Sequence, residues 1–175
     1  MHNHLKNKKQ GGFSNESKKF FSTRNIAKMA IVMALYASLT LVLTPISFGA
    51  IQVRVSELLV LLCFYNPIYC FSITIGCLIA NCFSPLGYVD IIFGTLATLI
   101  ACLGLHFIKN IFVGAGIAVL SNAFIVGAEL SVVYESNFWI MCGQVGLGEI
   151  IAIFGIGIPI FLSIKSTEVF KKIIE

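Results

Sequence analysis

Residues 111–134 read IFVGAGIAVLSNAFIVGAELSVVY, an apolar run with a single charged residue, Glu129. A helix of about 20 apolar residues spans the roughly 30 Å hydrocarbon core of a bilayer. Further apolar runs occupy residues 26–44, 55–65, 67–81, 89–107 and 138–164. Hydrophobic residues make up 58% of the chain and charged residues only 11%, which is more apolar surface than a soluble domain of this size can bury. The sequence therefore predicts an all-α integral membrane bundle.

The number of spans depends on residues 55–81, which form either two short helices or one long one. Asn66-Pro67 predicts a break, because proline lacks an amide hydrogen and clashes with the preceding helical turn. Six spans with a cytoplasmic N-terminus also place four lysines in the cytoplasm, as the positive-inside rule expects: Lys109, Lys165, Lys171 and Lys172. We therefore expect six transmembrane helices over residues 26–165, in the cytoplasmic membrane, with both termini cytoplasmic.

The two ends of the chain are expected to be cytoplasmic tails, residues 1–25 and 166–175. The first carries the basic residues Lys6, Lys8, Lys9, Lys18, Lys19 and Arg24. A signal peptide would have a short apolar core, whereas a full-length span follows here, so we expect the first helix to be retained. We interpret residues 1–25 as a disordered tail that faces anionic membrane lipid, not as a segment that binds nucleic acid.

The cysteines and histidines do not predict a metal site. Six cysteines lie in or beside apolar runs without a C-x-x-C pair: Cys63, Cys70, Cys77, Cys82, Cys102 and Cys142. A zinc or iron–sulfur site needs clustered Cys or His ligands, and His106 is alone near a helix end. We expect the cysteines to be packing residues, with no metal and no cofactor.

Alanines at positions 27, 30, 34 and 37 form a stripe on the first predicted helix. Small residues allow membrane helices to approach closely. Ala30 and Ala34 therefore predict either a face on which a partner helix docks or a packing contact within the same bundle.

Ionisable side chains at membrane depth are the strongest indication of a functional site, because a charged residue at the bilayer centre costs about 2.5–3.5 kcal/mol. Glu129 follows Asn122 by two helical turns, so both lie on one face. Glu149 lies in the last span, after Trp139 and Gln144. For each glutamate, the alternative to a ligand contact is an interhelical hydrogen bond.

Two further polar segments lie at the predicted outer side, and both are candidate lids over a ligand. The first contains Arg54 and Glu57, which are spaced to pair with one another across one helical turn. The second runs from Asn81 to Asp90, and Asp90 is also placed to begin a helix, where the helix dipole favours a carboxylate.

Five segments of the chain resemble the QueT family: QVRVSE (52–57), GCLIAN (76–81), DIIFGTLATL (90–99), NAFIVGAE (122–129) and Gly148-Glu149. The resemblance covers residues 26–165. It implies a six-helix substrate-binding subunit (S-component) of an energy-coupling factor transporter, with Ala30 and Ala34 docking on a transmembrane coupling subunit. It also implies two cytoplasmic ATPase subunits as partners. The basic tail before residue 25 is not part of this resemblance.

The substrate implied by this resemblance is a queuosine precursor, a deazapurine such as 7-aminomethyl-7-deazaguanine. One carboxylate can accept its paired ring and amino donors, a second can bind its cationic amine, an amide suits its carbonyl group, and an aromatic ring can stack on its flat face. Glu129, Glu149, Asn122, Asn81, Gln144 and Trp139 supply these groups, with Arg54, Glu57 and Asp90 as further candidates. Which carboxylate binds which end of the ligand is open.

Two alternatives remain at this point. The first is a binding subunit for another small molecule, such as a vitamin. The second is a membrane-embedded hydrolase or transferase, but the sequence has neither an H-E-x-x-H motif nor the clustered aspartates that such enzymes use. We therefore expect a transport protein and not an enzyme.

Overall fold

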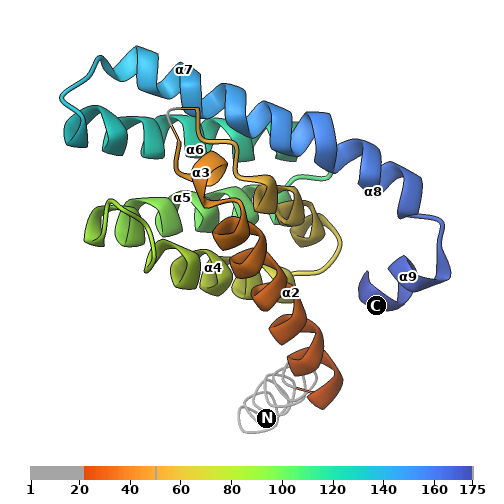
Figure 1. Ribbon diagram of the computed structural model, residues 1–175. Helices are drawn as coiled ribbons and strands as arrows, with labels where there is room; N and C mark the ends of the chain where they lie inside the picture. The colour runs from red at the N-terminus through yellow and green to blue at the C-terminus, as the bar shows by residue number, and fades with distance from the viewer. Residues whose placement is uncertain (1–21, 50, 175) are drawn as a thin grey trace, which may run out of the picture.

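The structure, a computed structural model, describes residues 22–49 and 51–174, and every regular element in that part of the chain is helical. Four helical segments are apolar and long enough to cross a membrane: α2 (Thr23–Val42), α5 (Tyr88–Phe107), α6 (Ile111–Val133) and a continuous rod (Phe138–Ile164). The rod joins α7 (Phe138–Glu149), the π-helix η2 (Ile150–Gly157) and α8 (Ile158–Ile164) (Figure 1). The predicted all-α fold with several membrane-spanning helices is confirmed.

Two shorter apolar helices follow α2 and the single turn α3 (Thr44–Ser47). The 3₁₀-helix η1 covers Val55–Phe64, and α4 covers Ile68–Asn81. The predicted break at Asn66-Pro67 is therefore confirmed. At rises of about 2.0 and 1.5 Å per residue, each helix is roughly 20 Å long, which is shorter than the hydrocarbon core. The count of six spans stays a prediction.

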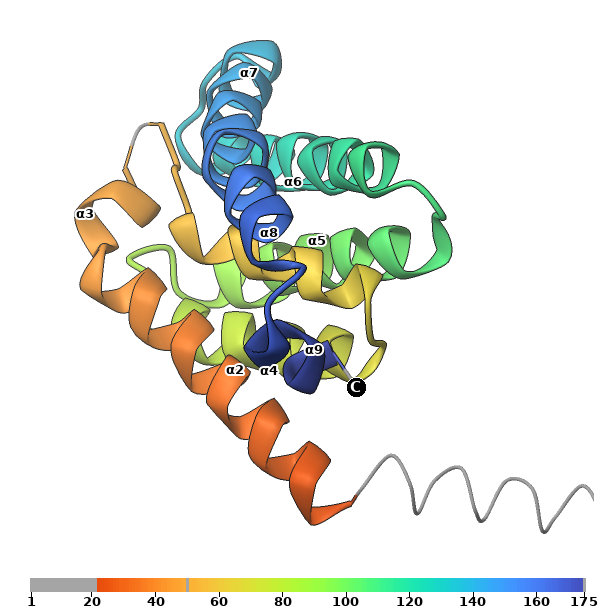
Figure 2. The ribbon, with the colours of Figure 1, turned by 90° about the vertical axis from the view of Figure 1, so that its right-hand side faces the viewer.

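The short helix η1 lies at the centre of the bundle. It contacts α2, α4, α5, α6, η2 and α8, and seven of its ten residues are buried. The surrounding helices pack in the order α2, α4, α5, α6 and α7, each against the next (Figure 2). Because its neighbours shield η1, its length need not match the thickness of a bilayer.

Helices extend into both predicted tails. Helix α2 begins at Thr23, within the predicted tail, because the side chain of Ser22 accepts a hydrogen bond from the amide of Asn25 at 3.3 Å. The rest of that tail, residues 1–21, lies outside the described residues. The predicted C-terminal tail contains a helix, α9 (Glu168–Ile174), which folds back onto the bundle.

Aromatic packing holds α9 in this place. The buried ring of Phe170 lies edge-on to Tyr65 and to Phe161, at centroid distances of 5.2 and 5.6 Å. Tyr65 follows η1 and Phe161 belongs to α8, so the ends of these two helices meet at α9. We call this end of the bundle the α9 end.

Candidate functional site

A buried ion pair joins two of the predicted residues at the end of the bundle opposite α9. Arg54 Nη2 donates to Asp90 Oδ1 at 2.9 Å and to Oδ2 at 3.2 Å, and the two side chains are 4% and 0% exposed. Asp90 lies in the first turn of α5, as predicted for a carboxylate that begins a helix. The local pair of Arg54 with Glu57 does not form, because the guanidinium group reaches across to α5 instead.

Asn81 and Gly94 fit closely around this ion pair. Asn81 is the last residue of α4, and its Nδ2 donates to the main-chain oxygen of Asp90 at 2.9 Å. Gly94 lies one turn after Asp90, and a Cβ atom there would lie 2.6 Å from Asp90 Oδ1 and 2.8 Å from Asn81 Nδ2. Only a residue without a side chain leaves room for both groups.

Gly94→Ala is therefore expected to destabilise the protein by about 1–3 kcal/mol, because the added methyl group displaces two buried, hydrogen-bonded side chains. Gly116→Ala on α6 is the matched control, since no described atom outside the adjacent backbone of its own helix and its two chain neighbours lies within 4 Å of its Cβ position. Alanine is favoured over glycine in a helix by up to about 1 kcal/mol, so the control is expected to be neutral or stabilised. Denaturant unfolding in detergent compares them, and equal stability of the two variants would contradict the tight packing at Gly94.

Glu57 is held by two hydroxyl groups that the sequence analysis missed. Its Oε1 accepts hydrogen bonds from Tyr36 on α2 and, at 3.1 Å, from Thr98 on α5, and all three side chains are fully buried. Its Oε2 has no partner among the described residues. The two hydroxyl groups thus fix the carboxyl group and leave one oxygen available.

The remaining polar residues of the site come from α6 and α7. Asn122 and Glu129 share the buried face of α6, and Glu149 is the last, buried residue of α7. Asn122 lies beside the carboxyl groups of Glu57 and Glu149. Glu129 lies within electrostatic range of the ion pair of Asp90 and Arg54. The structure therefore brings seven predicted residues into one buried group, which we call the polar cluster: Arg54, Glu57, Asn81, Asp90, Asn122, Glu129 and Glu149.

Unpaired atoms concentrate in the polar cluster. Among the described residues, seven of its buried atoms have no hydrogen-bond partner: Glu57 Oε2, Asn81 Oδ1, Glu129 Oε1, Glu129 Oε2, Glu149 Oε2, Arg54 Nε and Asn122 Nδ2. An unsatisfied buried polar group costs about 1–3 kcal/mol, so native proteins contain few of them. Five acceptor oxygens and two donor nitrogens in one place indicate a site that a polar ligand completes.

Gln144 and Trp139 lie outside the polar cluster. Gln144 is half-buried and lines a separate cavity of about 300 Å³, together with Phe48 and Tyr134. The ring of Phe48 lies 5.2 Å from Arg54 Cζ, so the cavity and the polar cluster are neighbours across this ring. Trp139 is 70% exposed and packs edge-on against Phe138.

The described residues contain no group of three or more His, Cys, Asp or Glu side chains placed to bind a metal ion. All six cysteines are free thiols. Two of them contact polar atoms in the core: Cys70 Sγ donates to the oxygen of Cys102 at 3.6 Å, and Cys77 Sγ lies 3.3 Å from Thr98 Oγ1. Four of the six cysteines are buried in the core, as expected of packing residues, whereas Cys82 is exposed and Cys142 is half-buried.

Comparison with known proteins places this chain in a family. The model of the QueT transporter family matches residues 26–166. This chain belongs to the QueT transporter family. It is 36% identical over 148 residues to the Queuosine precursor transporter QueT of Lactococcus lactis subsp. cremoris (strain MG1363), a match that covers 75% of this chain and 87% of that protein. No solved structure matches the chain.

Membership of the QueT family assigns transport, and not catalysis, to this multi-pass membrane protein. The alternative of a membrane-embedded hydrolase or transferase is thereby removed. The matched region contains the whole polar cluster and both alanines, Ala30 and Ala34.

Proposed function

We propose that this QueT family member is the substrate-binding subunit of an energy-coupling factor importer, an ABC-type transporter, and that its substrate is a queuosine precursor, 7-aminomethyl-7-deazaguanine. The relative from Lactococcus lactis is named as a queuosine precursor transporter. The observation that carries the choice of substrate is the set of unpaired atoms in the polar cluster.

The hydrogen-bonding groups of this molecule complement those atoms. Its ring N–H groups, its exocyclic amino group and its ammonium group donate, whereas its carbonyl oxygen and one ring nitrogen accept. The polar cluster offers five unpaired oxygens and two unpaired nitrogens, Arg54 Nε and Asn122 Nδ2. The two acceptors of the ligand thus match the two donors of the protein, and its many donors match the oxygens.

Charge supports the same substrate. Four carboxyl groups of the polar cluster face one cation, Arg54, which Asp90 already binds. The cationic aminomethyl group can neutralise one of Glu57, Glu129 and Glu149, and a second carboxylate can accept the adjacent ring and amino donors side by side. A vitamin without a cationic group would leave the carboxylates of the polar cluster without a counter-charge, which would cost binding free energy.

Mass spectrometry of the small molecules released when the purified protein is denatured tests this assignment. We expect a deazaguanine that carries an aminomethyl group, recovered from cells that contain the precursor. Recovery of a chemically unrelated compound would contradict the assignment. Recovery of a chemically altered product instead of the precursor would contradict the role as a binding subunit.

The exposed face of α2 supports docking of a second subunit. Ala27, Ala30 and Ala34 are exposed on this face, whereas Ala37 is buried against the bundle, so the stripe is shorter than predicted. Small exposed residues allow another membrane helix to pack closely. We propose that a transmembrane coupling subunit docks at Ala30 and Ala34. Two cytoplasmic ATPase subunits would supply energy, because this sequence lacks a phosphate-binding G-x-x-x-x-G-K-[ST] segment.

The orientation follows from the basic residues. We propose that the α9 end is cytoplasmic, because four lysines lie there, beyond the ends of the membrane-spanning helices: Lys109, Lys165, Lys171 and Lys172. In whole cells of a Cys82→Ser background, which removes an exposed thiol, Tyr88→Cys should react with a membrane-impermeant thiol reagent and Lys172→Cys should not. Labelling of Lys172→Cys in intact cells would contradict the six-span topology.

A further inference from the structure

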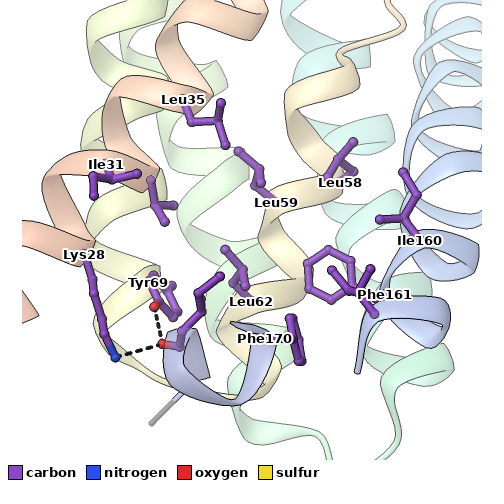
Figure 3. Close-up of a pocket in the computed structure, with 13 residues that line it drawn as sticks. Lys28, Ile31, Leu35, Leu58, Leu59, Leu62, Tyr69, Ile160, Phe161 and Phe170 are labelled. Atoms are coloured by element: carbon purple, nitrogen blue, oxygen red, sulfur yellow. Dashed lines mark hydrogen bonds between the residues drawn. The ribbon is translucent and has the colours of Figure 1, made fainter. Parts of the chain in front are cut away.

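An apolar cleft opens on the side of the bundle where the ring of helices does not close. It has a volume of about 310 Å³ and lies between α2 and α8, with η1 as its floor (Figure 3). Ile31 and Leu35 form one wall, Ile160 and Ile164 the other, and Leu58 and Leu59 the floor. All four wall residues are at least 36% exposed, so an apolar group from outside can enter between them.

Helix α9 closes the cleft at one end. Lys28 Nζ donates to the main-chain oxygens of Lys172 and Ile173, at 2.5 and 3.2 Å. The hydroxyl group of Tyr69 donates to the same oxygen of Ile173 at 2.5 Å (Figure 3). Phe170 and Ile173 line the cleft, whereas Lys171 and Lys172 are exposed. The cleft is therefore apolar along its length and basic where it ends.

In the described part of the chain, the charged side chains at this end are mostly basic. Five basic residues of the described chain lie within two helical turns of the lining: Arg24, Lys28, Lys165, Lys171 and Lys172. Among the residues that the structure describes, the acidic residue beside them is Glu168, which binds Lys171 Nζ at 2.8 Å. A group that completes this end would carry negative charge.

We propose that the cleft is a binding site for an anionic phospholipid. One acyl chain lies against Ile31, Leu35 and Leu58, and the phosphate group lies among the lysines at α9. Basic pockets between membrane helices recognise lipid head groups in this way. A transmembrane helix of a partner fits less well, because α9 blocks the end of the cleft and such a helix could not continue towards the aqueous side. A lipid does not need to continue past α9, because its head group lies at that end. The cleft lies beside the alanine face of α2, and this proposal does not depend on the transported substrate.

Quenching of tryptophan fluorescence by brominated lipid tests the proposal. Trp139→Phe removes the single tryptophan of the chain, and Leu35→Trp then places a probe in the cleft. Leu120→Trp, at an exposed position of α6 away from the cleft, is the matched control. In bilayers, we expect brominated phosphatidylglycerol to quench the cleft probe with about fivefold higher apparent affinity than brominated phosphatidylcholine. At the control position, we expect the two lipids to quench equally.

A variant of the lysines tests the position of the head group. Lys171→Gln combined with Lys172→Gln retains the Lys28 bonds to the main chain of α9 and is expected to lose most of the preference for phosphatidylglycerol, with little change in the unfolding temperature. A full preference in this variant would overturn the proposed head-group position. Equal quenching by both lipids at Leu35→Trp would show bulk lipid only, and no quenching there would show a cleft closed to lipid. Either result would overturn the proposal.

Discussion

Glu129→Gln is expected to weaken the binding of 7-aminomethyl-7-deazaguanine by about 2–5 kcal/mol. Both carboxyl oxygens of Glu129 are buried and unpaired, so in the proposed complex they are acceptors for the ligand. The substitution keeps the shape of the side chain but removes its charge and replaces one acceptor with a donor. A neutral amide is also less costly to place in the membrane than a carboxylate, so the stability without ligand should hold or rise.

The matched control for this prediction is Glu135→Gln, which makes the same chemical change at an exposed position after α6. It should leave both affinity and stability unchanged. Calorimetric titration with 7-aminomethyl-7-deazaguanine and with guanine shows whether the loss depends on the amine of the ligand. If a well-folded Glu129→Gln protein bound both compounds as the wild type does, Glu129 would not be part of the binding site.

Ala34→Leu is expected to abolish uptake while the isolated subunit still binds its ligand. Ala34 is exposed on α2, away from the polar cluster, so a larger side chain there does not disturb the fold. In the proposed complex, the leucine would separate α2 from the coupling subunit, because close helix packing in membranes depends on small residues. Ala30→Leu should have the same effect. Uptake of labelled ligand by cells, compared with its binding to purified protein, measures the two activities separately.

Ala128→Leu provides the control, since Ala128 is exposed on α6 and the change adds the same volume at a different face of the bundle. Uptake by this variant should equal that of the wild type. Equal loss of uptake in all three variants would show that added bulk alone is harmful. Parallel loss of binding and uptake in Ala34→Leu would make the alanine face an internal packing surface.

Helices whose positions depend on local interactions were predictable from the sequence. Long apolar runs predicted α2, α5, α6 and the final rod, and Asn66-Pro67 predicted the break after η1. The burial of η1 was not predictable, because it comes from the central position of η1 among six helical neighbours and not from its own composition. Helix α9 was missed for a similar reason: its contacts with Tyr65, Tyr69 and Lys28 come from distant parts of the chain.

The candidate site was partly predictable, because carboxylates in apolar runs are costly and therefore conspicuous. Glu129 and Glu149 were found in this way. The partner of Arg54 was not, since Asp90 lies 36 residues away and Glu57 offered a nearer alternative. Tyr36 and Thr98 carried no signal, because each is common in membrane helices as a packing residue. Only the folded bundle shows that both bind Glu57.

Calorimetric titration of the purified wild-type protein tests most directly the claim that the polar cluster binds a cationic deazaguanine. We expect saturable one-to-one binding of 7-aminomethyl-7-deazaguanine. Guanine, which lacks the cationic amine, should bind at least about tenfold more weakly, because a charge-assisted hydrogen bond is worth about 1.5–3 kcal/mol. Equal affinity for the two compounds, or no saturable binding of either by folded protein, would contradict this claim.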